Sequence, residues 1–269
     1  MLTPSHPTVN PFFTPFEGSI ADYSLPDKFP SPFNYIPHPL SLPAVEMLQL
    51  HLETQQDWQH NFGLSDEAGS VIGKMFGVLV VRTERNEIGY LAAFSGKLAG
   101  GNHHARFVPP IFDGIAKGGF LNAGMIALSR MNSEIRMRED QKSESHETQV
   151  RNLKVLRRNH SVSLQNEIFD QYRFLNQTGE ECSLRKIFVD ASYKNPPAGA
   201  GECAAPKLLQ YAFRHNMKPI AMAEFWWGLS PKSDFWKHGH FYPACREKCA
   251  PILEHMLSAT ETYAEPTLS

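Results

Sequence analysis

GKMFGVLVVRTERNEIGYLAAFSG, residues 73–96, holds two apolar, β-branched runs on either side of the polar turn TERNE. Two such runs joined by a short polar turn predict an antiparallel β-hairpin. The runs are apolar on consecutive residues, so we expect both strands to be well buried. The hairpin would form the first part of the core.

Helical patterns lie on both sides of this hairpin. Apolar residues at helical spacing predict a helix in AVEMLQLHLETQQDWQH, residues 44–60. Residues 120–176 carry two amphipathic stretches joined by the polar KSESHE, which predicts an antiparallel helical hairpin projecting from the core. Between them, the glycine-rich segment 96–120 is expected to be a long loop that either is functional or wraps another element.

The C-terminal part of the chain alternates helix and strand. SLRKIFVD, residues 183–190, is expected to be a short strand or the end of a helix. ECAAPKLLQYAFRH, residues 202–215, predicts a helix, because Pro206 falls in its first turn, where no N–H is required. KPIAMAEFWWG, residues 218–228, predicts a strand. PACREKCAPILEHML, residues 243–257, predicts a final helix.

The expected fold class is α/β (α+β), with a deaminase-like three-layer core. Prolines at high density in residues 1–43 forbid regular helix or central strand, while the many aromatic residues there argue against a disordered tail. We therefore expect an extended arm whose rings are anchored in surface grooves. The predicted parts are the arm 1–43, one discontinuous core domain 44–119 and 177–257, the helical insertion 120–176 and a frayed tail 258–269.

Composition limits the class of protein. The chain has 269 residues, of which 42% are hydrophobic and 20% charged, and its formal net charge is -2. These values are typical of a soluble globular protein and lack the basic excess of most nucleic-acid-binding domains. No signal-peptide pattern and no apolar run of about 18 residues occurs, so we expect a cytoplasmic protein with no membrane partner.

One segment, RNLKVLRRNH at residues 151–160, is locally basic. Its charges fit the solvated face of a helix, and they also fit a contact with RNA phosphates. Both interpretations stay open for Arg151, Lys154, Arg157 and Arg158. A basic patch on the same side as the aromatic arm would favour RNA.

The four cysteines are the main candidates for chemistry. Cys203 lies at the start of a predicted helix, and Cys245 and Cys249 share one face of another at i, i+4 spacing. Helix N-termini favour thiolates, and clustered cysteines in a reducing compartment are often metal ligands. A zinc site made of Cys203, Cys245 and Cys249 is one interpretation, and buried unligated thiols are the other.

The order of elements resembles the zinc nucleoside and base deaminases, in which a strand hairpin precedes a helix opening with H/C-x-E and a later helix opening with P-C-x-x-C. The resemblance implies zinc-activated water and a proton-shuttling glutamate. Two features depart from it. Glu202 precedes Cys203 instead of following at the second position, and the second cysteine pair has C-x3-C spacing.

Three further assignments stay open. Either Glu202 or Glu224 is a candidate for the proton-transfer group, although Glu224 also fits a hydrogen-bonded core carboxylate. His240, or His238 beside it, is a candidate fourth zinc ligand that would close the site and make it structural. Trp226 and Trp227 are placed to stack a base or to pack in the core.

Several long motifs resemble the N-terminal extension of a subset of bacterial RluA-type RNA pseudouridine synthases. The resemblance covers about residues 10–257. The motifs are FPSPFNYIPHPL, IGKMFGVLVV, IGYLAAFSGKLAG, FVPPIFD, PPAGAGECAAPKLLQYAF, KPIAMAEFWWG and FYPACREKCAPILEHML.

The resemblance implies a link to RNA modification, with structured RNA and a synthase domain as expected partners. The Arg-Leu-Asp motif of the synthase catalytic domain does not occur in this sequence. The first hypothesis is therefore an auxiliary, RNA-engaging module without isomerase activity of its own. The alternative is a zinc-dependent, deaminase-like hydrolase acting on a nucleobase. A third is a scaffold whose helical hairpin mediates oligomerisation.

Overall fold

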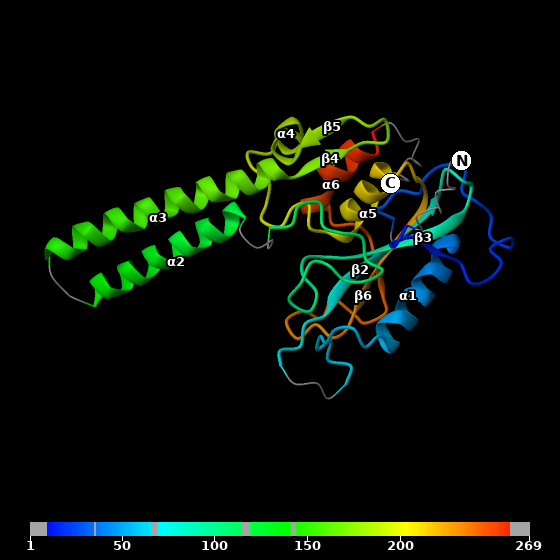
Figure 1. The fold of residues 1–269 in the computed structure, drawn as a ribbon, viewed down its shortest axis with the longest axis horizontal. Coiled ribbons are helices and arrows are strands. Elements are labelled where there is room, and N and C mark those ends of the chain that lie inside the picture. Colours follow the sequence, from blue (N-terminus) through cyan, green and yellow to red (C-terminus); the bar gives the residue numbers. More distant parts are fainter. Residues whose placement is uncertain (1–9, 35, 66–68, 115–118, 141–143, 259–269) are drawn as a thin grey trace, which may run out of the picture.

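A five-stranded sheet forms the centre of the protein (Figure 1). The computed structural model describes residues 10–34, 36–65, 69–114, 119–140 and 144–258. Neighbouring strands in this sheet are antiparallel, so the fold is a mixed α/β fold. The strand order is β1 (Thr14–Pro15), β3 (Ile88–Phe94), β2 (Lys74–Arg82), β6 (Lys218–Trp227) and β7 (Phe241–Tyr242).

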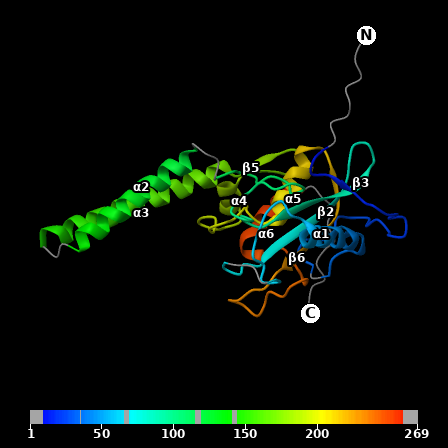
Figure 2. The same ribbon diagram turned by 60° about the horizontal axis from the view of Figure 1, so that its bottom comes forward.

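The predicted hairpin 73–96 is confirmed as β2 and β3, which pair from Phe76 opposite Phe94 to Arg82 opposite Ile88. Both strands are buried because helices cover both faces of the sheet (Figure 2). Side chains of a strand alternate between faces. Thus Phe76, Val78 and Val80 belong to one core, and Leu79 and Val81 belong to the other.

Helix α1 (Leu42–Thr54) packs on the first face through Leu48 and Leu52. It is shorter than the predicted helix 44–60. The Gln55 side-chain oxygen accepts hydrogen bonds from the backbone N–H groups of Asp57, at 3.0 Å, and Trp58, at 3.3 Å. These bonds take the place of helical backbone hydrogen bonds, so the helix ends at Thr54.

Three helices cover the second face. They are α4 (Leu184–Asp190), α5 (Ala204–Arg214) and α6 (Arg246–Met256), and all three contribute to the same core. The predicted helices at 202–215 and 243–257 and the predicted strand at 218–228 are thereby confirmed. Of the two alternatives for 183–190, the helix is correct, and the Ser183 hydroxyl caps it by accepting from the Lys186 N–H.

The described part of the N-terminal segment is an extended arm, as predicted. Its rings are anchored in the domain. Phe12 meets Tyr211 edge-to-face with ring centroids 5.4 Å apart, and the Tyr211 hydroxyl donates to Asn10 Oδ1 at 2.9 Å. Phe16 packs on Tyr90 at 5.9 Å. The arm adds β1 to the free edge of β3, so it completes the sheet as well as covering it.

Helices α2 (Phe120–Glu139) and α3 (Glu144–Gln171) form the predicted antiparallel hairpin, which projects from the core in both views (Figures 1 and 2). Their contact is close at Gly124, where an added Cβ would lie 2.6 Å from Leu164 Cδ1. An ion pair between Lys154 Nζ and Glu139 Oε1, 2.7 Å apart, links the helices further out.

The helical pattern that was predicted to continue to residue 176 stops at Gln171. Residues Arg173–Leu175 form strand β4, which pairs with β5 (Glu181–Ser183). Tyr172 and Phe174 are buried while Arg173 between them is exposed, a period of two that suits a strand. The predicted tail falls mostly on residues 259–269, which lie outside the described residues. None of the described helices is both long and apolar enough to cross a membrane.

Gly89→Ala tests how the arm is anchored. A Cβ at Gly89 would lie 2.5 Å from Thr14 O and 2.5 Å from the Phe13 ring, so the arm must move away. We expect faster limited proteolysis of residues 10–23 and a loss of about 1–3 kcal/mol in the free energy of unfolding. Gly18→Ala is the matched control, since no atom lies within 4 Å of its Cβ. Equal behaviour of the two variants would contradict this anchoring.

Candidate functional site

Two helix N-termini on the second face of the sheet bring three cysteines together. Cys203 is the N-cap residue of α5, and Cys245 is the N-cap residue of α6. Cys249, one turn into α6, is fully buried and forms hydrogen bonds with both Cys203 and Cys245. Cys182 lies apart, on β5.

The three thiols form a chain with Cys249 in the middle. Among the residues that the structure describes, no group of three or more His, Cys, Asp or Glu side chains is arranged to hold a metal ion. The donor set is nevertheless one that suits zinc, because thiolate sulfur at helix N-termini is a common zinc ligand.

Cys245 and Cys249 have pKa values shifted in opposite directions. The hydrogen bond from Cys249, followed by the backbone N–H groups of Lys248 and Glu247, lowers the pKa of Cys245 to about 5. The Cys245 side chain forms no helix-capping hydrogen bond, but the N–H groups at the start of α6 still favour its thiolate. Hydrogen bonds with Cys203 and Cys245, together with burial, raise the pKa of Cys249 well above its usual value. These opposite shifts favour the thiolate at Cys245 and the thiol at Cys249.

Glu224 faces these thiols from strand β6. It is 7% exposed, and its Oε1 accepts a hydrogen bond from the Ala205 N–H in the first turn of α5 at 3.3 Å. Burial raises the pKa of Glu224 to about 7, and the nearby charge of Cys245 adds to this shift. Glu224 lies opposite Gly77 in the sheet. The missing side chain of Gly77 lets the start of α5 approach the sheet closely, because a Cβ there would lie 3.1 Å from Ala204 Cβ.

A pocket of about 400 Å³, here called the thiol pocket, opens onto these groups. Trp226 and Trp236 form one wall, with their rings stacked 5.0 Å apart at an interplanar angle of 23°. Trp227, the other predicted stacking residue, is buried and packs edge-on against Phe225. The residues that line the thiol pocket include Lys74, Glu202, Cys203, Glu224, Cys245 and Lys248.

Glu202 lies at the edge of the thiol pocket and is exposed. The Tyr172 hydroxyl donates to its Oε1 at 3.4 Å, and its backbone carbonyl accepts from Gly96 N at 2.9 Å. Burial, followed by the charge of Glu202, raises the pKa of Tyr172, so this phenol stays protonated and can donate. Of the two predicted proton-transfer groups, Glu224 is the one that is buried against the thiols.

The predicted histidine ligands have other surroundings. His240 does not line the thiol pocket, and its backbone carbonyl accepts from Trp226 N at 2.9 Å. His238 accepts a hydrogen bond from Gly228 N at 3.0 Å through Nδ1, and its ring packs against Trp227. Neither contact brings a histidine nitrogen to the cysteines.

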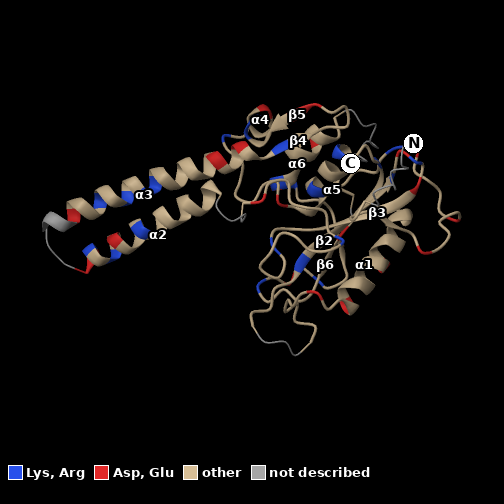
Figure 3. Cartoon of the chain, in the orientation of Figure 1, with Lys and Arg blue, Asp and Glu red and all other residues tan. Residues whose placement is uncertain are grey.

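The predicted RNA-contacting residues lie on the projecting hairpin, on the opposite side of the core from the aromatic arm (Figure 1). Basic and acidic residues both occur along α2 and α3, with a basic band near the middle of α3 (Figure 3). Arg151, Lys154, Arg157 and Arg158 are all exposed, and Lys154 pairs with Glu139. The patch therefore does not share a side with the arm.

Lys207 and Trp236 were not among the predicted site residues. Lys207 follows Pro206 within the apolar helix sequence AAPKLLQYAF, four residues after Cys203. A lysine among buried positions of an amphipathic helix is a detectable signal, because such positions rarely hold a charge. Trp236 had no such signal, since it lies in the irregular loop between β6 and β7.

No protein-family model, no curated protein and no solved structure matches this chain. Its resemblance to the extension of RluA-type synthases and to the zinc deaminases therefore stays a prediction.

Alkylation with iodoacetamide tests the thiol chain. In metal-free protein, we expect the rate at Cys245 to be nearly constant above about pH 6, because its thiolate is already formed there. Burial raises the pKa of Cys182, so that thiol should need a higher pH. Cys249→Ala removes the hydrogen bond and should shift the Cys245 profile to higher pH. Peptide mass spectrometry measures each site, and a roughly tenfold rise per pH unit at Cys245 between pH 6 and 8 would contradict the assignment.

Glu224→Gln tests the buried carboxyl in metal-free protein. Because its pKa is higher in the folded state, the folded protein binds the proton more tightly and loses stability as pH rises from about 4.5 through 7. The unfolding free energy of the variant minus that of the native protein should rise by on the order of 3 kcal/mol from pH 5 to pH 8. Urea denaturation measures this change. Glu202→Gln, at an exposed position nearby, is the control, and the same pH trend in both variants would refute the burial effect.

Proposed function

We propose that this protein is a zinc-dependent, deaminase-like hydrolase that acts on a nucleobase in the context of RNA modification. The observation that carries the proposal is that Cys203 and Cys245, at two helix N-termini and linked by Cys249, line one pocket together with the buried carboxyl of Glu224. A perturbed nucleophile, a perturbed acid and a concave pocket together are the usual marks of a catalytic site.

Cys203, Cys245 and Cys249 are the residues that would hold the metal. When bound, zinc would supply Lewis-acid activation of a water molecule. The thiolate form of Cys245 is already favoured by the hydrogen bond from Cys249 and by the backbone N–H groups at the start of α6. This lowers the proton release needed for coordination at neutral pH.

Glu224 is the proposed proton shuttle. With a pKa of about 7, it can both accept and donate a proton near neutral pH. In hydrolytic deamination, a C–O bond to water forms, the C–N bond to the amino group breaks, and ammonia leaves. Glu224 would carry the proton from the water to the departing amine. This role replaces that of the deaminase glutamate two residues after the first ligand, where this chain has Ala205.

The walls of the thiol pocket support a flat heterocycle as substrate. The Trp226 and Trp236 rings border the pocket, and an aromatic wall stacks bases of any sequence. The order of helix, strand and helix from α5 through β6 to α6 agrees with the deaminase-like resemblance. A catalytic role for the pocket is favoured over a closed structural zinc site, because neither His238 nor His240 lines it.

The second candidate is an auxiliary RNA-engaging module that lacks isomerase activity and acts with a synthase domain. Its support is the exposed basic band of α3 on a hairpin that projects from the core (Figure 1). The two functions are compatible in one protein, because none of the residues of the basic band lines the thiol pocket.

Metal content and ammonia release test the proposed function. Native protein is expected to contain about one equivalent of zinc, and Cys245→Ser/Cys249→Ser should lose it. With free bases, nucleosides and RNA as substrates, Glu224→Gln should retain the metal but lose about 10²–10⁴ of the rate. Cys182→Ser is the matched cysteine control and should retain both metal and rate. Native protein without zinc, or full activity in Glu224→Gln, would overturn the proposal.

A further inference from the structure

A second chamber, of about 180 Å³, adjoins the thiol pocket and shares Gly96 and Glu202 with it. Its walls come from three parts of the chain. The loop after β3 contributes Lys97, Asn102 and Phe112, the base of the helical hairpin contributes Leu121, Ile168 and Tyr172, and α5 contributes Lys207. Gly96 and Glu202, joined by a backbone hydrogen bond of 2.9 Å, therefore border both cavities.

Lys207 is the distinctive group of the chamber. It is 5% exposed, and its Nζ donates to Phe94 O at 2.8 Å and to Gly96 O at 3.3 Å. An ammonium group has three donors, so one N–H remains beyond these two bonds. Within the described part of the chain, no third acceptor is bonded to it, and Lys207 lines the chamber. A buried cation with a remaining donor favours an oxygen-rich anion.

The charges around the two cavities point the same way. Lys74, Lys97, Lys207 and Lys248 line them, against the carboxylates Glu202 and Glu224. Glu224 belongs to the thiol pocket, which leaves Glu202 as the carboxylate of the chamber. Its Oε1 accepts from the Tyr172 hydroxyl, which offsets part of its repulsion of an anion. With the Cys245 thiolate included, four lysines face three groups that can be negative, so the combined cavity keeps a small surplus of positive charge.

We propose that this chamber binds the phosphate group of a nucleotide whose base occupies the thiol pocket. The inference rests on the proposed function for the choice of a base as the ligand, and it adds the phosphate as the recognised substituent. Lys207 and Lys97 supply the charged donors, and the apolar Phe112 and Ile168 enclose the sugar. The phosphate has two sources, a free mononucleotide or one unit of an RNA strand.

Binding measurements on the full chain test the inference. Isothermal titration near neutral pH compares each of the four ribonucleosides with its 5′-monophosphate at constant ionic strength. For the base that binds tightest, the monophosphate should bind at least about tenfold more tightly than the nucleoside. In Lys97→Ala this ratio should fall to about twofold or less, with nucleoside affinity unchanged, and in Leu121→Trp, which fills the chamber from α2, the monophosphate should lose its advantage over the nucleoside.

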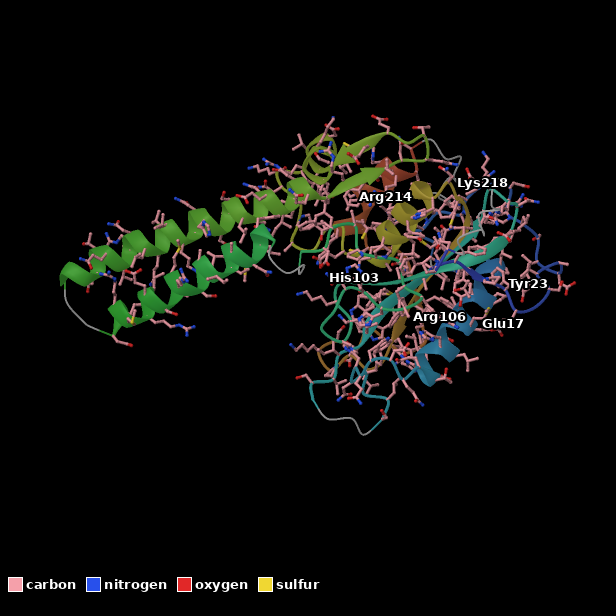
Figure 4. All side chains as sticks on the ribbon, in the orientation of Figure 1. Glu17, Tyr23, His103, Arg106, Arg214 and Lys218 are labelled. Carbon is pink, nitrogen blue, oxygen red and sulfur yellow. The ribbon has the colours of Figure 1, made fainter. Side chains whose placement is uncertain are left out.

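Lys218→Ala is the matched control, because Lys218 is exposed at the end of β6 near the arm, away from the hairpin (Figure 4). It should keep the full phosphate preference. Lys207→Met should abolish the phosphate preference if the variant folds. If it does not fold, Lys97→Ala and Leu121→Trp carry the test. A single-stranded RNA pentanucleotide separates the sources: tighter binding than the monophosphate indicates an RNA strand, and equal or weaker binding indicates a free nucleotide.

The outcomes separate this inference from the proposed function. Equal affinity for nucleoside and monophosphate, or a preference that Lys97→Ala and Leu121→Trp leave intact, would overturn the phosphate site even if zinc and ammonia release were found. A phosphate preference that these variants remove, in a protein without zinc or ammonia release, would support the site and reject the hydrolase. Absence of binding by every probe would reject both.

Discussion

The hydrogen bond between the Ala205 N–H and Glu224 Oε1 joins the sheet to the helix that begins the site. It satisfies an N–H of the first turn of α5 with a carboxylate from β6, so Cys203 at the N-cap is not needed as the cap. The positive end of the helix in turn reduces the cost of burying Glu224. One contact thus fixes the position of α5 and leaves the Cys203 sulfur free to meet Cys249.

The same physical principle acts twice in the site. Each of two adjacent helices begins on one side of the sheet, and each places a cysteine where unpaired backbone N–H groups favour negative charge. Cys249 then links the two sulfurs, and its burial keeps that link away from water. Lysines around the pockets balance these negative groups. The result is a small region in which thiolate, carboxylate and ammonium groups are held together by burial and helix ends.

Local sequence patterns were sufficient for the elements but not for all of the site. The hairpin 73–96, the helix start at Cys203 and the i, i+4 pair Cys245 and Cys249 depend on neighbours along the chain, and these predictions were confirmed. The partnership of Glu224 with α5 depends on the register of β6 against β2, which no local pattern encodes. The conformation of the loop before β7 likewise depends on backbone hydrogen bonds of Trp226 with Gly239 and His240. The position of His240 could therefore not be predicted from the sequence.

The helical hairpin enters and leaves the core at one place. Phe112 stacks on Phe120 where α2 begins, and the same ring meets Tyr172 edge-to-face just after α3 ends. Beyond the close contact of Gly124 with Leu164, a turn added to each helix would lengthen the hairpin and leave this junction in place. Each added turn extends the hairpin by about 5.4 Å. The length of the helical hairpin can therefore change independently of the core. Its base stays fixed beside the lysine-lined chamber.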